Sequence, residues 1–200
     1  TSYVTSGSRG WGQYYDEDGH ALFVRIGNLC RDSIDLDLSN TEYLTLPENA
    51  EGKRTRLQEG DVLLSITADI GSVGVVSDSL GEAYVNQHVA LTRPRQDLVL
   101  PRWMGYALIS GMGRPQLRSQ LYGGTKDGVS LTDVKNVKLY VPPLPEQKRI
   151  VEHIDAKTAD IDAAIERTEQ QIALMKQYRT SLVTEVVTGA VDVREETAAA

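Results

Sequence analysis

The chain has 200 residues, of which 40% are hydrophobic, so it can bury a sizeable core. It contains no signal-peptide pattern and no apolar run as long as the roughly 20 residues of a membrane span, which excludes the membrane class and predicts a cytoplasmic protein. Its single cysteine, Cys30, excludes an internal disulfide. Its net charge of -7 argues at first sight against a nucleic-acid partner, because phosphates bind to cationic surfaces.

Residues 1–141 predict a domain of mixed secondary structure. A tight turn at Ala68–Gly71 is expected between two strands, since Gly71 can supply the positive φ that such a turn needs. A short helix is expected at 101–111, and a final strand in VKLYVPPLP (137–145). The other expected strands are short β-branched runs bounded by Gly, Asn or Pro, at 22–26, 41–46, 61–66, 72–77 and 83–94. The expected fold class is therefore α+β, or mixed α/β.

The stretch VPPLPEQKRI (141–150) divides the chain into two kinds of structure. Its three prolines fix φ and remove three backbone donors, so neither a strand nor a helix runs through them. From Glu146 to Thr188 the sequence holds no Gly or Pro, and Gly189 suits the end of a helix. Such a helix would be roughly 64 Å long. We therefore expect a globular domain at 1–141, a proline corner with a long helix at 142–189, and a tail at 190–200.

The long helix carries an apolar heptad stripe, which predicts an antiparallel coiled coil because helices much beyond 25 residues usually pair. Thr158, Thr168 and Arg179 interrupt the stripe and suit a role in fixing register or orientation. The alternative is that the helix folds back on its own domain. The expected dimer interface consists of Val151, Ile154, Ile161, Ile165, Ile172, Met175, Leu182 and Val186.

Basic and aromatic residues are interleaved in two segments, 1–15 and 93–126, although the whole chain is acidic. Such interleaving suits phosphate contacts together with base stacking. The alternative is scattered surface arginines and core aromatics, and Trp11 fits a core position nearly as well. The segment 93–126 holds six cationic residues and one acid, Asp97. The candidate DNA contacts are Arg9, Trp11, Tyr14, Tyr15, Arg114, Arg118 and Lys126.

Catalytic signals are weak throughout the sequence. The three histidines, at 20, 88 and 153, are isolated, and none has metal-ligand spacing with another histidine or with Cys30. His88 is interpreted as a strand residue satisfied by a hydrogen bond, and Asp69 as a turn-former. GGTKDG (123–128) lacks the spacing of a phosphate loop. We expect no catalytic residue, no metal and no cofactor.

The segment from Pro142 to Glu195 resembles the conserved helical region of the specificity subunits of type I restriction-modification systems. The similarity rests on the proline run, the EQ-R-I start, the ID-I repeat at 161–165 and the terminal TG-DVR sequence. The preceding domain resembles a target recognition domain. That similarity rests on TSGSRGW (5–11), RIGNL (25–29), GDVLLSITADIG (60–71) and NQHVALTRP (86–94).

This resemblance implies a non-catalytic subunit that reads half of a split double-stranded DNA target. It also implies that methyltransferase (modification) subunits dock on the helices, that the restriction subunit joins through them, and that methylation and cleavage reside on those partners. The family usually carries two recognition domains and two helices, whereas this chain has one of each and lacks the residues that normally precede TSGSRGW. We expect either a naturally half-sized subunit or the second half of a longer protein, and in both cases self-association through 146–188. The other hypothesis is a dimeric coiled-coil adaptor that does not read DNA.

Overall fold

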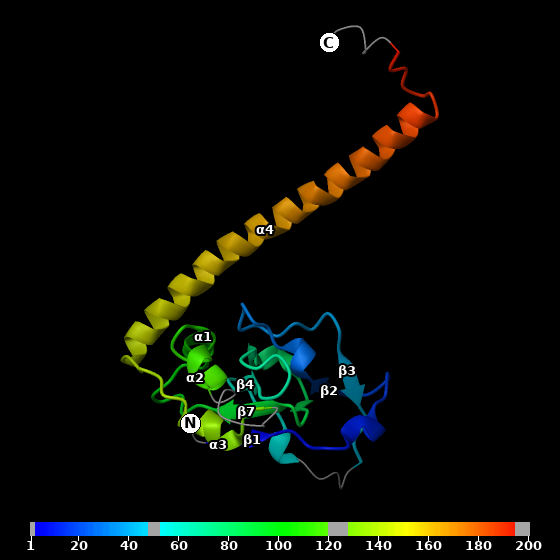
Figure 1. Ribbon diagram of the computed structural model, residues 1–200. Helices are drawn as coiled ribbons and strands as arrows, with labels where there is room; N and C mark the ends of the chain where they lie inside the picture. Colours follow the sequence, from blue (N-terminus) through cyan, green and yellow to red (C-terminus); the bar gives the residue numbers. More distant parts are fainter. Residues whose placement is uncertain (1–2, 48–52, 120–127, 195–200) are drawn as a thin grey trace. The chain divides into compact units, whose positions relative to one another are not determined.

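The computed structural model describes residues 3–47, 53–119 and 128–194 (Figure 1). The chain divides into two compact units, Thr1–Val151 and Glu152–Ala200, called the head and the rod below. The head thus continues ten residues beyond the expected boundary after Val141.

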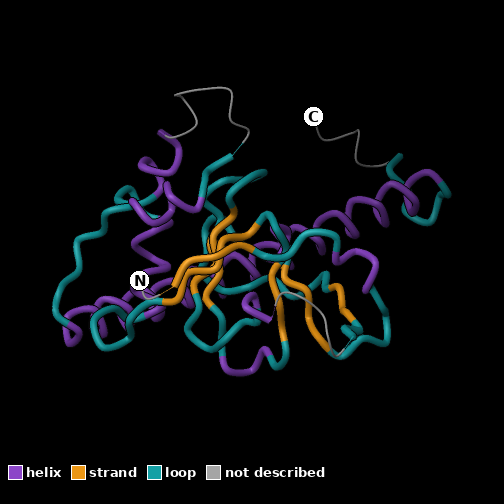
Figure 2. The backbone as a smooth tube through the Cα atoms, turned by 90° about the horizontal axis from the view of Figure 1, so that it is seen from below, coloured by secondary structure: helices purple, strands orange, loops and turns teal. Residues whose placement is uncertain are grey.

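Two sheets form the centre of the head, where their strands make two groups (Figure 2). All neighbouring strands of the larger sheet are antiparallel. In the smaller sheet β2 pairs antiparallel with β3 and parallel with β6. The larger sheet has the order β1 (Tyr3–Ser6), β7 (Val89–Arg93), β4 (Val62–Ser65), β5 (Val73–Val75). The smaller has the order β3 (Glu42–Leu44), β2 (Ala21–Val24), β6 (Ala83–Val85). The expected mixed fold is confirmed.

Two strand predictions were wrong in detail. The run 83–94 is two strands, because the turn Asn86–His88 carries the chain from β6 in the smaller sheet to β7 in the larger one. The stretch 137–145 forms no strand, because its polar groups find other partners. The backbone N–H of Lys138 donates to the side chain of Gln116 (3.0 Å), which in turn donates to the Lys138 carbonyl (2.8 Å). Tyr140 is 76% exposed.

Short helices complete the head. The expected helix is present as α1 (Pro101–Ile109), with proline in its first turn. The sequence did not indicate α2 (Arg114–Ser119) or α3 (Leu131–Asn136), although Ser130 and Asp133 form a capping box at the start of α3. Four single 3-10 turns lie at Trp11–Tyr14, Ile26–Asn28, Lys53–Thr55 and Asp78–Leu80.

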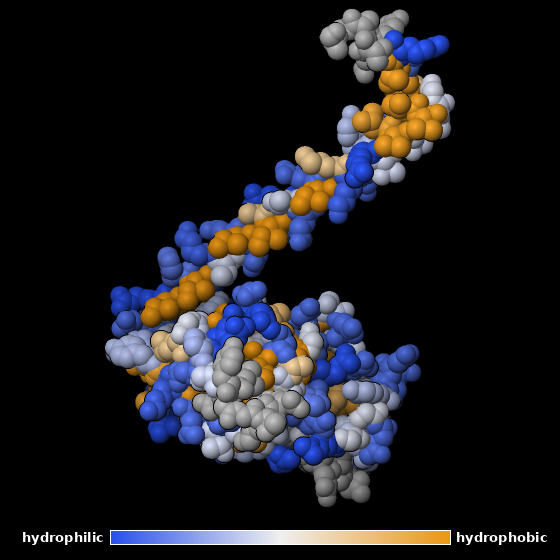
Figure 3. All heavy atoms as spheres, viewed as in Figure 1, coloured by the Kyte–Doolittle hydropathy of each residue, from blue (hydrophilic) through white to orange (hydrophobic). Residues whose placement is uncertain are grey.

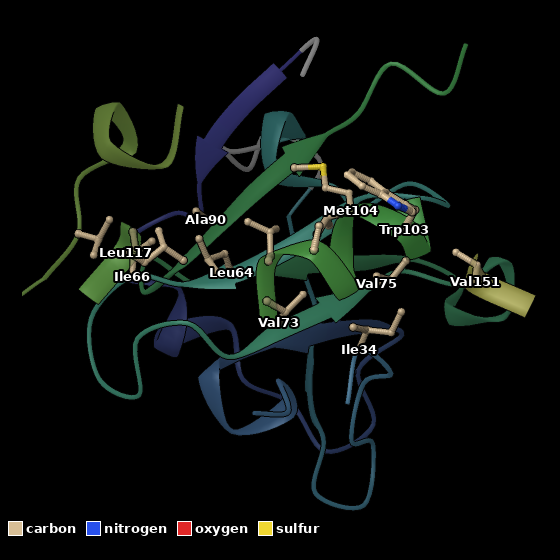
Figure 4. Packing of buried hydrophobic residues seen from close by; sticks show 14 residues of the cluster. Ile34, Leu64, Ile66, Val73, Val75, Ala90, Trp103, Met104, Leu117 and Val151 are labelled. Carbon is tan, nitrogen blue, oxygen red and sulfur yellow. The ribbon is translucent and has the colours of Figure 1, made fainter. Parts of the chain in front are cut away.

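Strands β4, β5 and β7 of the larger sheet are buried on both faces, which explains why β4 and most of β7 read as apolar runs without alternation. On one face, Leu64 and Val73 pack with Trp103 and Met104 of α1 (Figure 4). On the other, Leu63 belongs to a cluster shared with the smaller sheet. A third cluster contains Trp11, Ala21, Phe23, Leu44 and Tyr84.

The proline corner leads directly into the long helix α4 (Leu144–Val187), whose first turns belong to the head. Gln147 is fully buried, and its side chain makes three hydrogen bonds to backbone groups. Its oxygen accepts from the Leu100 N–H (2.8 Å), and its amide nitrogen donates to the carbonyls of Leu98 (2.9 Å) and Pro142 (2.7 Å). Val151, one turn later, lies in the same core as Trp103. The assignment of Val151 to a dimer interface was therefore wrong, because its side chain is already buried in the head.

The rod consists of the rest of α4 and the residues that follow. The helix ends as expected, with Gly189 at a φ of 78°. Figure 3 shows an apolar stripe along α4. Ile154 and Val186 are half-buried. The other residues expected in the stripe are exposed: Ile161 by 56%, Ile165 by 51%, Ile172 by 47%, Met175 by 71% and Leu182 by 41%. In the part of the chain that the structure describes, no helix is long and apolar enough to cross a membrane.

Candidate nucleic-acid interface

Three turns meet at one edge of the larger sheet. Strand pairing places the end of β1 beside the start of β7 (Ser6 opposite Ala90), and the end of β4 beside the same start (Ser65 opposite Val89). The segments that leave these strand ends are 7–10, 66–71 and 86–88, together called the loop rim. Backbone hydrogen bonds join them, from the Gly7 N–H to the Asn86 carbonyl (3.1 Å) and from the Ile66 N–H to the His88 carbonyl (3.1 Å).

The first segment of the loop rim holds Arg9 next to tightly packed glycine. A Cβ at Gly7 would lie 2.0 Å from the Val85 carbonyl oxygen, so no other residue fits there. Gly10 has a φ of 76°, which glycine adopts without strain. Arg9 lies between the two glycines and is exposed. The small residues therefore hold this backbone against the β6–β7 turn and present a long cationic side chain to solvent.

The turn Asn86–His88 carries a chain of side-chain hydrogen bonds. The amide nitrogen of Gln87 lies 2.9 Å from Nε2 of His88, and Nδ1 of His88 lies 3.2 Å from the Thr67 hydroxyl. Because an amide nitrogen only donates, Nε2 accepts and the proton of a neutral ring is on Nδ1. Asn86 closes the turn by accepting from the His88 N–H (3.1 Å). Gln87 is thus held in place, and the glutamine amide is a side chain that can bond two adjacent groups of an adenine edge.

The β4–β5 turn brings a second cationic group to the loop rim. Asp69 adopts a left-handed conformation (φ 51°), accepts from Ser72 and pairs with Arg31. Arg114, at the start of α2, donates to the Arg31 carbonyl. Arg118 lies one turn further along α2 and is exposed. Arg31, Arg114 and Arg118 therefore lie on neighbouring segments, and the Asp69 carboxylate is paired with Arg31.

Two kinds of reaction site bear on the described residues, a metal cluster and a reactive thiol. Among residues 3–47, 53–119 and 128–194, no three His, Cys, Asp or Glu side chains are placed to hold a metal ion. Burial, followed by the charge of Asp37, raises the pKa of the Cys30 thiol, which disfavours the reactive thiolate. The arrangement of turns, arginines and amides at the loop rim suits binding to an anionic ligand with hydrogen-bonding edges.

Comparison with known proteins identifies the family. The sequence profile described as "Type I restriction modification DNA specificity domain" matches residues 32–174, which is more than half of the chain. The chain belongs to this family.

Curated members of the type I specificity family are similar over most of this chain. The EcoKI specificity subunit of Escherichia coli K12 and the StySPI specificity subunit of Salmonella potsdam are each 22% identical over 180 residues. Those residues cover 88% of this chain and 37% of either relative, so the chain spans well under half the length of these relatives.

Solved structures show the same fold. One chain comes from a study of complex assembly and conformational transition of the type I R-M system, with a TM-score of 0.67, 22% identity, and coverage of 91% of this chain and 42% of its own. The HsdS subunit from Thermoanaerobacter tengcongensis has a TM-score of 0.59, 21% identity, and coverage of 82% and 41%.

Within this type I specificity domain, the residues proposed from sequence fall into three groups. Arg9 lies on the loop rim, Arg114 lies next to Gly71 of the rim, and Arg118 lies one turn further along α2. Lys126 lies outside the described residues. Of the three aromatics, Trp11 belongs to the third cluster, Tyr14 packs against it, and Tyr15 contacts its Phe23 ring.

Trp11 is 6% exposed and stacks on Phe23 with ring centroids 6.1 Å apart, so it takes the core position that the sequence left open. Tyr14 is half-buried against the same cluster. Tyr15 is 45% exposed and meets Phe23 edge-on at 5.7 Å. The aromatic signal in the first 15 residues therefore comes mainly from packing of the smaller sheet.

Several arginines of the basic segment 93–126 are paired with acids that lie close to them in the fold. Arg93 pairs with Asp61 through two bonds of 2.7 and 2.8 Å, which raises the pKa of the Arg93 guanidinium. Arg102 pairs with Asp35 (2.7 Å). A third pair joins Arg95 and Asp97 (2.8 Å). Two of these acids lie outside the segment, so counting charges within it overstated its positive balance.

Sequence reasoning missed Gln87, Thr67 and Arg31 as members of the site. They lie on three different segments that only the strand registers bring together. The one available signal was the quoted NQH stretch, where polar residues interrupt an otherwise apolar run. That interruption marks the turn between β6 and β7.

Proposed function

We propose that this chain is a DNA sequence-recognition component of a type I restriction-modification complex, and that the loop rim reads one half of a split target. The observation that carries the proposal is the loop rim itself. It is a set of joined turns that presents Arg9 and Gln87, lies beside Arg114 and Arg118, and belongs to a domain of the type I specificity family. Arginine suits guanine edges and phosphates, and glutamine suits adenine.

The rod supports the second part of the proposal, which is self-association. A narrow stripe of exposed isoleucine, methionine and leucine on a long helix is the surface that a second helix covers in a coiled coil. Two copies related by a two-fold axis would carry two loop rims, one for each half of a split target.

The rest of the complex is assigned to partners. Methylation is carried by modification subunits that dock on this chain, and cleavage by a restriction subunit that joins through them. In this assignment the chain supplies the DNA address and takes no part in the reaction. The expected domains remain the recognition domain, the proline corner with its long helix, and the tail from 190, with the first turns of α4 serving as a part of the head.

The decisive experiment begins with the methylated motif in the source genome. A fluorescently labelled duplex with that motif, and a duplex of the same length with the motif scrambled, are titrated with this chain and its modification subunits. The proposal predicts a split motif and a preference of roughly 1000-fold for it at physiological salt. Equal affinity for both duplexes overturns DNA readout. It supports the second candidate, a coiled-coil adaptor, which the net charge of -7 favours.

A further inference from the structure

The polar interruptions of the rod stripe contain information about how two copies align. In the heptad repeat, positions a and d form the stripe, with Ile165 and Ile172 at a and Met175 at d. Thr168 occupies a d position and Arg179 an a position. Both side chains are exposed on the described helix, as are Ile165, Ile172 and Met175. The alignment argued below rests on the proposed homodimer and adds its register.

Parallel pairing in register is disfavoured by Arg179 itself. In a parallel coiled coil each a residue faces the same residue of the second copy. Two guanidinium groups would then meet inside an apolar seam, where like charges have no water to screen them. An antiparallel pair avoids this contact, because a residues then face d residues.

We propose that two copies pair antiparallel with the two-fold axis at the junction of Ala173 and Leu174. In this register Thr168 faces Arg179 of the second copy, so two of the three polar interruptions share one layer and the guanidinium can reach the threonine hydroxyl or solvent. The third, Thr158, falls opposite Gly189, beyond the end of α4. Each remaining layer pairs one apolar residue with another: Ile172 with Met175, Ile165 with Leu182, and Ile161 with Val186. The residues of these layers are exposed or, for Val186, half-buried.

The neighbouring registers, shifted by one heptad, lose this match. One of them places Arg179 against Ile161 and Thr158 against Leu182. A shift of one further heptad in the same direction would need Val151 in the seam, but Val151 is already buried in the head core. The shift in the opposite direction places Arg179 against Met175. Each alternative therefore buries a charged group against an apolar side chain, which is costly unless the charge finds a partner.

Charges beside the stripe favour the same register. In antiparallel pairs, residues at the e positions of the two helices lie next to each other. The proposed register brings Glu169 beside Lys176 of the second copy, twice per dimer. The register that places Arg179 against Ile161 brings Glu169 beside Glu169 of the second copy. A shift of one further heptad in the same direction brings Glu169 beside Asp162 of the second copy. Both registers therefore place like charges together.

Distance measurements by pulsed electron paramagnetic resonance test the register. Spin labels are attached to Ala163→Cys in one sample and Thr184→Cys in another, each in the full chain with Cys30→Ser. Both positions lie on the face of α4 opposite the stripe, at equal distances from the proposed axis. The axial separation between the two labels of a dimer is then about 32 Å in either sample. A shift of one heptad gives about 21 Å in one sample and about 42 Å in the other.

Equal distances that match the axial separation of about 32 Å in both samples support the register, and unequal distances overturn it. Short distances in both samples mean parallel pairing, which also overturns it. The absence of any dipolar signal means that the chain is monomeric, which removes the dimer and leaves DNA readout to the titration described above. The failure of the register and the failure of the proposed function are thus distinguishable.

A charge exchange provides an independent check. Glu169→Lys and Lys176→Glu, made singly, should each weaken the dimer roughly 2- to 30-fold in sedimentation equilibrium, since each affects two exposed ion pairs per dimer. The double variant Glu169→Lys/Lys176→Glu should recover the original affinity, because the pairs reform with reversed signs. A double variant that is weaker than both single variants overturns the pairing of these two residues.

Discussion

The head and the rod differ in whether their side chains find partners within the same unit. In the described part of the head, no buried side-chain nitrogen or oxygen lacks a hydrogen-bond partner, and Gln147 and Asp61 are fully buried with their partners in the same unit. In the rod, Ile172 and Met175 are 47% and 71% exposed. The head is therefore complete as a folded unit, whereas the rod presents apolar surface that a second helix would remove from water.

The largest expected effect comes from placing a charge in the centre of the rod stripe. Ile172→Asp would bury two carboxylates near the proposed axis, at an expected cost to the dimer of more than about 5 kcal/mol, because desolvation costs several kcal/mol per ion. Light scattering at tens of micromolar should show a dimer for the original chain and a monomer for the variant. The matched control is Leu174→Asp, two residues away, which lies off the stripe and should leave the dimer intact. Loss of the dimer in both variants would mean that the stripe is not the interface.

The next effect belongs to the head, where an arginine pairs with a buried acid. Asp61 has no exposed side-chain surface, and Arg93 binds it with two hydrogen bonds. Arg93→Met leaves a buried carboxylate without its cation, and should lower the free energy of unfolding by about 3 kcal/mol. Both tryptophans of the chain, Trp11 and Trp103, lie in the head core, so their fluorescence in a urea titration reports the head alone.

The control for this pair is Arg95→Met. Arg95 and its partner Asp97 are 57% and 62% exposed, and pairs of that kind contribute about 0–1 kcal/mol. A similar loss of stability from both variants would contradict the distinction between buried and exposed pairs in the head.

A smaller effect is expected at Gln147, which shares its helix with the rod but makes its bonds within the head. Gln147→Met keeps the length of the side chain and leaves the Leu100 N–H and two carbonyls without their partner. The head should lose about 2 kcal/mol in the same urea titration. Gln171→Met, on the exposed part of α4, should change the free energy of unfolding by less than about 0.5 kcal/mol. Equal effects would mean that the amide bonds of Gln147 do not anchor the start of the helix.

The same contrast explains which features the sequence predicted. The rod is defined by local rules, since proline near its start, a heptad stripe and Gly189 at its end are all read directly from neighbouring residues. The helix was therefore predicted to within two residues at its start and one at its end. Val151 was misassigned because the heptad pattern does not indicate where the head core ends.

The head depends on contacts between distant residues, and prediction was weaker there. Short apolar runs located β2, β4 and β5, but not the crossing from one sheet to the other at Asn86–His88. The partners of Arg93 and Arg102 are Asp61 and Asp35, far away in sequence, so a local charge count could not detect them. The members of the loop rim are likewise brought together by strand register alone. Local signals were limited to Arg9, held between two glycines, and to the NQH stretch that interrupts an apolar run.

The loop rim is the part of the head that resembles the rod stripe, because it leaves side chains for a partner. Arg9 is the sharpest example, since it is exposed while the backbone around it is tightly packed. If Arg9 reads a base, Arg9→Ala should weaken binding to the cognate duplex by about 1–3 kcal/mol and binding to the scrambled duplex much less. Fluorescence anisotropy with the modification subunits present measures both affinities.

Arg118→Ala distinguishes base reading from phosphate contact. Its position on α2 suits a contact with a phosphate, so binding to both duplexes should weaken alike. The slope of log affinity against log salt concentration should become shallower by about one. Arg95→Ala, whose guanidinium pairs with Asp97 within the head, should leave both affinities unchanged. If Arg9→Ala weakens binding to both duplexes alike, Arg9 contacts the DNA backbone, and base recognition is then assigned to Gln87. An unchanged affinity in both variants would separate the DNA surface from the loop rim altogether.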